Sequence, residues 1–163
     1  MTANPVLRNS NVTHAVFTIE RTYAAAPARV FAAFASPEAK ARWFAGPDEW
    51  TELERAMDFR EGGRERVRGR FPNGRVSDFD ACYFDIVQGQ RIVYGYNMHV
   101  DDQRISVSLA TIELKPDGAR THLTFTEQGA YLDGYDDAGS REHGTRALLE
   151  SLARSLEPVS AKA

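Results

Sequence analysis

The first part of the segment "TFTEQGAYLDGYDDAGSREHGTRALLESL", residues 124–152, holds within seventeen positions six side chains that can act as acids, bases or metal ligands. They are Glu127, Asp133, Asp136, Asp137, Glu142 and His143. A metal centre needs several such groups to converge on one point, and acid–base catalysis needs a carboxyl group whose pKa is shifted. The alternative is that the segment is purely structural and consists of a strand end, a loop and a helix cap. The secondary-structure elements that carry these residues decide between a functional site and this alternative.

Hydrophobic periodicity predicts one strand, two short helices, six further strands and a long final helix. The first strand is "HAVFTIERTY", and the two helices are "APARVFAAF" and "SPEAKARWF", where Pro27 and Pro37 suit a first turn and Ser36 suits a cap. The later strands are expected at 51–58, 63–71, 76–87, 91–99, 104–114 and 120–128, separated by turn-forming residues. The last segment, "GSREHGTRALLESLARSLEP", is amphipathic at the helical period and ends at Pro158.

This order of elements predicts an α+β fold. Short connections between successive strands indicate a curved antiparallel seven-stranded sheet, and the apolar stripe of the last helix must pack across its inner face. We expect one domain at residues 14–157, with tails at 1–13 and 158–163, because 163 residues suffice for one substantial core.

Composition excludes several classes of function. The net charge of −3 favours neither nucleic acid nor an anionic membrane, and no segment is apolar for long enough to cross a bilayer. The N-terminus lacks the pattern of a signal peptide, and the single Cys82 fits a reducing compartment. We therefore expect a cytoplasmic protein that binds neither nucleic acid nor membrane, with a homodimer left open. No motif for a metal or another cofactor is present.

Four arginines, Arg64, Arg66, Arg68 and Arg70, alternate along one predicted strand. They suggest nucleic-acid binding, but the next strand carries Asp78 and Asp80. A three-residue loop at 73–75 would place Arg70 opposite Asp78 and Arg68 opposite Asp80. The arginines then form a solvated outer face, and the inner face holds Val67, Phe71, Phe79, Ala81 and Tyr83.

The same alternation sorts the remaining strands. The residues expected to face inward are Ile92, Tyr94, Tyr96, Met98, Ile105, Val107, Leu109, Leu123, Phe125 and Glu127. His99 and His122 are expected on the outer face. On the final helix Arg141, Thr145, Leu148, Leu149, Leu152 and Leu156 share one stripe, whereas His143 faces solvent.

Glu127 is the candidate functional residue, since a carboxyl group on an apolar face needs a partner or a raised pKa. Arg141 is the expected partner; the alternative is a hydrated structural pair at the rim. Hydroxyl groups could add polar points to an apolar pocket, and Trp43 is either a pocket wall or plain core. The candidate ligand-binding residues are Trp43, Phe79, Tyr94, Tyr96, Glu127, Tyr131, Arg141 and Thr145. No catalytic set is assigned, because one inward acid without a matching base supports no mechanism. Residues 131–137 are expected to form a loop whose acids suit the helix N-terminus.

Four segments together carry a resemblance to a known family. They are "AAAPARVFAAFASPEAKARWFAGP", "MDFREGGRERVRG", "LKPDGARTHLTFTEQGAY" and "HGTRALLESLARSLE". In this order they resemble the START-like (SRPBCC) helix-grip superfamily, and within it the bacterial branch named after the activator of the Hsp90 ATPase, often labelled polyketide cyclase-like. The resemblance covers residues 14–157 and implies a deep cavity between sheet and last helix. It implies no shared catalytic set. Relatives often have Gly-Trp where this chain has Gly144-Thr145, which would widen the cavity.

The expected function is binding of a small hydrophobic or aromatic ligand in that cavity. One alternative is an enzyme of the cyclase, dehydratase or hydrolase type that acts on such a ligand. A second is a protein-interaction domain like the co-chaperone that gives the family its name.

Overall fold

The computed structural model of the protein describes residues 10–158. The elements are β1 (Val12–Tyr23), α1 (Pro27–Ala35), α2 (Pro37–Ala41), β2 (Thr51–Met57), β3 (Arg64–Arg70), β4 (Val76–Val87), β5 (Arg91–Val100), β6 (Gln103–Asp117), β7 (Arg120–Leu132) and α3 (Ala138–Ser155). Their order and type confirm the prediction. β7 is longer than expected, so Tyr131 lies on this strand rather than in a loop. Most of the two expected tails lies outside the described residues.

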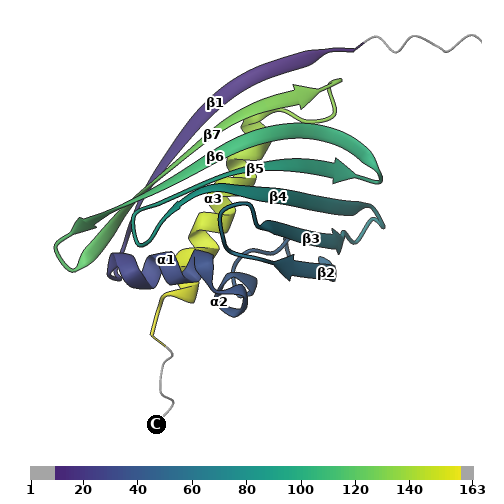
Figure 1. The fold of residues 1–163 in the computed structure, drawn as a ribbon. Coiled ribbons are helices and arrows are strands. Elements are labelled where there is room, and N and C mark those ends of the chain that lie inside the picture. Colours follow the sequence, from purple (N-terminus) through teal and green to yellow (C-terminus); the bar gives the residue numbers. More distant parts are fainter. Residues whose placement is uncertain (1–9, 159–163) are drawn as a thin grey trace, which may run out of the picture.

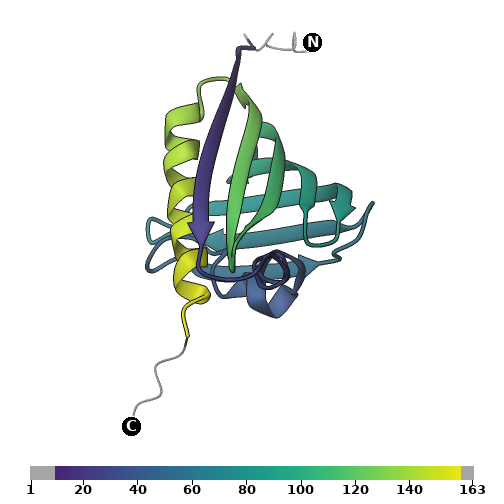
Figure 2. The same ribbon diagram turned by 90° about the vertical axis from the view of Figure 1, so that its left-hand side faces the viewer.

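All seven strands form one antiparallel sheet in the order β1-β7-β6-β5-β4-β3-β2. β1 is the only strand without a sequence neighbour beside it, since it pairs with β7 while α1 and α2 lead the chain to the opposite edge. The sheet curves around α3, which lies along its inner face, and α1 and α2 sit at the end near the C-terminus of α3 (Figures 1 and 2). This is the helix-grip arrangement.

The helices begin where local chemistry favours them. Ser36 caps α2 by accepting a hydrogen bond from the backbone N–H of Ala39 at 3.3 Å. Asp137 caps α3 in the same way, with Oδ1 accepting from the N–H of Ser140 at 2.8 Å. This contact lowers the pKa of Asp137. No helix of the described residues is both long and apolar enough to cross a membrane.

The core fills the space between the sheet, α1 and α3. Its most deeply buried apolar side chains are Ile19, Val30, Phe31, Tyr83, Ile92, Ile112, Leu123, Leu149 and Leu152. The predicted stripe of α3 supplies this core, because Leu149 and Leu152 are buried and Leu148 packs at its margin, whereas His143 is exposed. The side of α3 that meets the sheet was therefore predicted correctly.

The β3–β4 hairpin has the predicted inner face at Val67, Phe79, Ala81 and Tyr83 but a different register, and Phe71 lies in the connection rather than on a strand. Arg68 lies opposite Asp78 and Arg66 opposite Asp80, which is two residues away from the predicted pairing. The connection spans residues 71–75 rather than 73–75. A shift of two residues leaves every side chain on its face, so the arginines remain outside. Their side chains reach diagonally, since Arg64 forms two hydrogen bonds to Asp80 and Arg66 two to Asp78.

The prediction for β6 was wrong in one respect: Val107 and Leu109 face outward, and both are exposed. The β5–β6 ladder shifts register just before Ser106, so Ile105 is an extra residue on β6, and the consecutive residues Ile105 and Ser106 are both buried. Such a β-bulge reverses the inward and outward positions of every residue that follows. The inward side chains of β6 are Ser106, Ser108, Ala110, Ile112 and Leu114. His99 and His122 lie on the outer face, as predicted: His99 is opposite Asp78, and His122 is 3.1 Å from Glu20.

Candidate functional site

Glu127 is buried on the inner face of β7, with 1% of its surface exposed. Tyr96 on β5 donates its hydroxyl hydrogen to Oε1 of Glu127 at 2.9 Å. The guanidinium of Arg141, from the first turns of α3, lies 3.8 Å from Oε2. The sequence-predicted partners therefore do meet, from a strand and a helix that grip the same point.

Arg141 is the centre of this network. Its Nη1 donates to the Tyr96 hydroxyl at 2.7 Å, and its Nη2 donates to Ser106 Oγ at 2.7 Å and to Asp136 Oδ2 at 2.9 Å. The guanidinium also lies 5.6 Å from the ring centroids of both Tyr96 and Tyr131. These contacts hold a desolvated cation in one orientation, which is how arginine commonly contributes to a binding site.

Burial and charge oppose each other at Glu127. Burial raises the pKa of its carboxyl group above the ordinary value, while Arg141 and the hydrogen bond from Tyr96 act in the other direction. Burial also raises the pKa of Tyr96 and of Tyr94, so both phenols stay neutral at physiological pH. The site thus presents neutral hydroxyl groups around one buried ion pair.

Three buried polar atoms near Arg141 have no hydrogen-bond partner among residues 10–158. They are Oε2 of Glu127, the hydroxyl of Tyr131 and Oγ of Ser108. The register places them around Gly129, because Glu127 and Tyr131 flank it on β7 and Ser108 lies opposite on β6. A Cβ atom at Gly129 would come within 2.9 Å of the Tyr131 ring, so the glycine makes room for that ring. Unpaired buried polar groups are costly, so this concentration is a suitable place for a polar group that is not part of the chain.

A second buried ion pair lies elsewhere in the interior and was missed by the sequence prediction. Lys40 on α2 donates to Oε1 of Glu65 on β3 at 2.6 Å, and the Tyr83 hydroxyl donates to the same oxygen at 2.6 Å. All three residues are at least 95% buried, and Oε2 of Glu65 has no partner in the described part of the chain. One signal was available, since the alternation that turns Val67 inward also turns Glu65 inward.

A row of three tyrosines connects the two ion pairs. Tyr83 and Tyr94 have ring centroids 6.1 Å apart, and Tyr94 and Tyr96 are separated by the same 6.1 Å. Tyr83 contacts Glu65 at one end, and Tyr96 contacts Glu127 at the other. Phe79 packs against both Tyr94 and Tyr96. The interior therefore carries a polar group at each end of an aromatic surface.

The other proposed site residues occupy different surroundings. Trp43 is buried among Phe34 and Phe44, and its indole N–H donates to the Ala33 carbonyl at 2.9 Å. This is the core alternative for Trp43. Thr145 faces the sheet, but its hydroxyl donates to the Arg141 carbonyl within α3. Of the acids in the opening segment, Asp136 joins Arg141 and Asp137 caps the helix, so most of them do not converge on Glu127. Over residues 10–158, no three His, Cys, Asp or Glu side chains are grouped to hold a metal ion.

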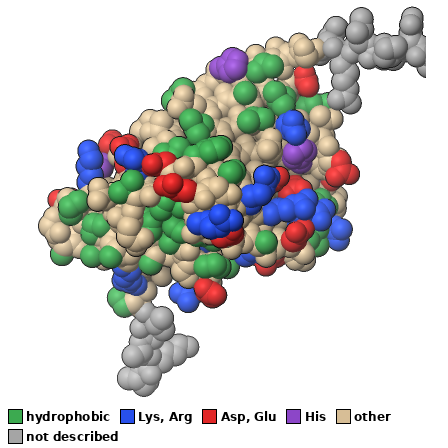
Figure 3. Space-filling model, in the orientation of Figure 1, with side chains coloured by type: hydrophobic (Ala, Val, Ile, Leu, Met, Phe, Trp, Pro, Cys, Tyr) green, Lys and Arg blue, Asp and Glu red, His purple; other side chains and the backbone are tan. Residues whose placement is uncertain are grey.

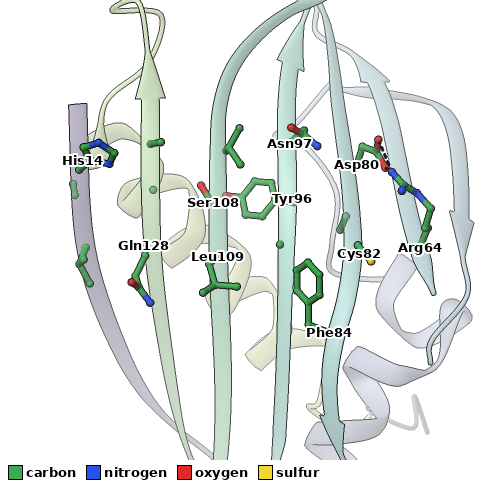
Figure 4. A pocket seen from close by; sticks show the side chains of 17 residues that line it. His14, Arg64, Asp80, Cys82, Phe84, Tyr96, Asn97, Ser108, Leu109 and Gln128 are labelled. Atoms are coloured by element: carbon green, nitrogen blue, oxygen red, sulfur yellow. Dashed lines mark hydrogen bonds and ion pairs between the residues drawn. The ribbon is translucent and has the colours of Figure 1, made fainter. Parts of the chain in front are cut away.

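A hollow of about 830 Å³ lies on the outer face of the sheet, opposite α3 (Figure 4). Its apolar part consists of Val16, Phe84, Val107 and Leu109, and hydrophobic side chains gather beside a band of paired charges on this side of the molecule (Figure 3). The Phe84 ring lies over Gly95, where a Cβ atom would approach it within 2.8 Å. This hollow is on the other side of the sheet from the cavity that the sequence resemblance implies.

Comparison with known proteins identifies relatives over most of the chain. The family model described as "Activator of Hsp90 ATPase homolog 1-like protein" matches residues 24–157. A structure of an uncharacterised protein from Rhizobium leguminosarum is 43% identical, with a TM-score of 0.86 and coverage of 90% of this chain and 97% of that one. A Rhizobium loti protein is 49% identical, with a TM-score of 0.83 and coverage of 90% and 99%. A Chromobacterium violaceum protein is 28% identical, with a TM-score of 0.73 and coverage of 88% and 97%. No curated protein matches the chain.

Proposed function

Because the chain belongs to the family of activator of Hsp90 ATPase homolog 1-like proteins, within the START-like helix-grip superfamily, we propose that it binds a small hydrophobic or aromatic molecule between the inner face of the sheet and α3. The observation that carries this proposal is the set of three buried polar atoms, on Glu127, Ser108 and Tyr131, that have no hydrogen-bond partner among residues 10–158; Glu127 and Tyr131 also lie close to the Arg141 guanidinium.

The surroundings of these atoms define the kind of ligand. Tyr94, Tyr96 and Phe79 offer aromatic surface, which favours a flat apolar body. A single polar group on that body would take up hydrogen bonds that otherwise go unmade. A binding site of this composition, mostly apolar with a few fixed polar groups, is the usual one for small molecules.

Solvent contact within the network indicates the entrance. Arg141 keeps 10% of its side-chain surface exposed and Asp136 keeps 19%, whereas Glu127 keeps 1%. The ligand is therefore expected to enter past the β7–α3 connection, where Asp136 is seated.

The test is a titration with 2-naphthol, a flat aromatic probe with one hydroxyl group, followed by its fluorescence. We expect saturable binding to the wild-type protein and a several-fold to tenfold higher Kd for Tyr131→Phe, since one neutral hydrogen bond contributes about 0.5–1.5 kcal/mol. Tyr135→Phe is the matched control, because Tyr135 is about half exposed and should leave the Kd unchanged. Absence of saturable binding, or equal loss in both variants, would contradict the proposal.

A further inference from the structure

We infer that the ligand is an uncharged, flat aromatic molecule with a hydroxyl group at each of two opposite ends, one for Glu127 and one for Glu65. This inference rests on the proposed function, because it concerns the molecule bound in the same interior. It adds a second polar contact that the Glu127 site alone does not require. The two carboxylates stand at the two ends of the tyrosine row, and each has one oxygen that accepts no hydrogen bond from residues 10–158.

The Lys40–Glu65 ion pair retains hydrogen-bonding capacity for a further polar group. Oε1 of Glu65 already accepts hydrogen bonds from Lys40 and Tyr83, whereas Oε2 accepts none from residues 10–158. An ammonium group has three donors, and Lys40 uses one on Glu65. The end therefore offers an acceptor and spare donors side by side. A hydroxyl group matches both, because it donates to the carboxylate and accepts from the ammonium.

The ring environment keeps this end apolar apart from the ion pair. The Lys40 nitrogen lies 4.5 Å from the Phe44 ring centroid and 5.8 Å from that of Tyr94. Phe59 packs edge-on against Tyr83 at 5.0 Å. Burial of an ion pair costs several kcal/mol of desolvation for each charge, and apolar residues of similar volume are often no less stable. Fold stability alone therefore gives a weak reason for Lys40 and Glu65 to be here.

The charges at the two ends favour a ligand that is neutral at both. At the first end the charges of Lys40 and Glu65 cancel. A cationic group there would be repelled by the ammonium, and an anionic group would be repelled by the carboxylate. At the second end Arg141 faces two carboxylates, Glu127 and Asp136, which disfavours an anion. A neutral hydroxyl group is the polar group that suits both ends.

The tyrosine row sets the shape of the molecule. Tyr83 on β4 lies opposite Tyr94 on β5, and Tyr96 follows two residues along β5, so the row turns at Tyr94 between two ring-to-ring steps of 6.1 Å. Tyr94, in the middle, keeps the largest exposed fraction of the three, 8% against 2% and 5%. A fused aromatic system lying over Tyr94 would place its two ends toward Tyr83 and Tyr96, and hence toward the two carboxylates.

The experiment compares 2-naphthol with 2,6-dihydroxynaphthalene and with 6-hydroxy-2-naphthoic acid on the wild-type protein. We expect the second hydroxyl group to lower the Kd about tenfold or more, as hydrogen bonds to charged groups do, and the carboxylate to abolish that gain. In the double variant Lys40→Met/Glu65→Gln, which leaves no buried charge unpaired, 2-naphthol should bind as before. The advantage of 2,6-dihydroxynaphthalene should disappear.

The outcomes separate this inference from the proposed function. If 2-naphthol does not bind the wild-type protein, both fail. If 2-naphthol binds and the second hydroxyl group adds no affinity, or adds it equally in the double variant, only the two-ended ligand is overturned. The wild-type comparison stands by itself should the double variant fail to fold.

Discussion

Arg141 on α3 and Glu127 on β7 approach to 3.8 Å inside the protein, and Tyr96 links them by a hydrogen bond to each. The ion pair thus joins the N-terminal turns of the gripping helix to β7, the strand next to the edge strand β1. Since both side chains are buried, neither charge can be compensated by water if the other is removed.

Replacing Arg141 by Met should lower the free energy of unfolding by about 3–5 kcal/mol, because Glu127 is left as an unpaired buried carboxyl group. Urea unfolding followed by circular dichroism measures this. Arg146→Met is the control: Arg146 is 43% exposed and pairs with Glu142 on the helix surface, so its loss should cost about 0.5 kcal/mol or less. Equal losses of unfolding free energy in the two variants would mean that the buried ion pair contributes no more to stability than the surface pair.

The raised pKa of Glu127 predicts a defined dependence of stability on pH. The folded protein holds the Glu127 proton more strongly than the unfolded chain, whose pKa is near 4.5. Relative to Glu127→Gln, wild-type stability should therefore be greatest below pH 4.5 and fall as the pH rises through the folded pKa, then level off. Urea unfolding of both proteins from pH 4 to neutrality gives this difference. A difference that rises with pH would mean a depressed pKa.

Two glycines should respond in opposite ways to alanine. Gly129→Ala brings a Cβ atom within 2.9 Å of the Tyr131 ring and should destabilise the fold by about 1–3 kcal/mol. Gly144→Ala adds a methyl group to an open position of α3 and should stabilise it by up to about 1 kcal/mol. Thermal unfolding of the pair tests the packing around Tyr131; a neutral Gly129→Ala would show that the ring can move aside freely.

The bulge at Ile105 predicts which residues of β6 matter for stability. Ile112 is 1% exposed on the inner face, so Ile112→Ala should cost about 2–5 kcal/mol. Leu109 is 37% exposed on the outer face, so Leu109→Ala should cost much less, about 1 kcal/mol at most. The unbulged strand of the sequence prediction would give Leu109 the larger effect, and chemical denaturation distinguishes the two registers.

Much of the fold follows from sequence because it depends on local periodicity. Alternation along β7 turned Glu127 inward, and helical spacing turned Arg141 toward the sheet, so their meeting could be predicted. What failed depends on pairing between strands. The extra residue at Ile105 leaves no mark in the composition, and the hairpin loop at 71–75 admits two registers that keep the same faces.

The Lys40–Glu65 pair shows a different limit. From the local sequence each residue resembles an ordinary surface charge, since Lys40 lies in a short polar helix and Glu65 in a strand of alternating charges. Their proximity exists only when α2 is folded over the sheet, which no local pattern reports. Alternation along the strand turns Glu65 inward, but no local pattern identifies Lys40 as its partner.

The position of β1 at the sheet edge beside β7 has a consequence for folding during synthesis on the ribosome. Thr18 and Thr126 touch in the finished sheet, yet 108 positions of chain separate them. At 5–20 residues per second, β1 leaves the ribosome about 5–20 s before β7, the strand with which it pairs, has been made. During that interval the apolar side of β1, with Phe17 and Ile19, has no sheet to cover it. The last strand to emerge is therefore the one that brings the first into the fold.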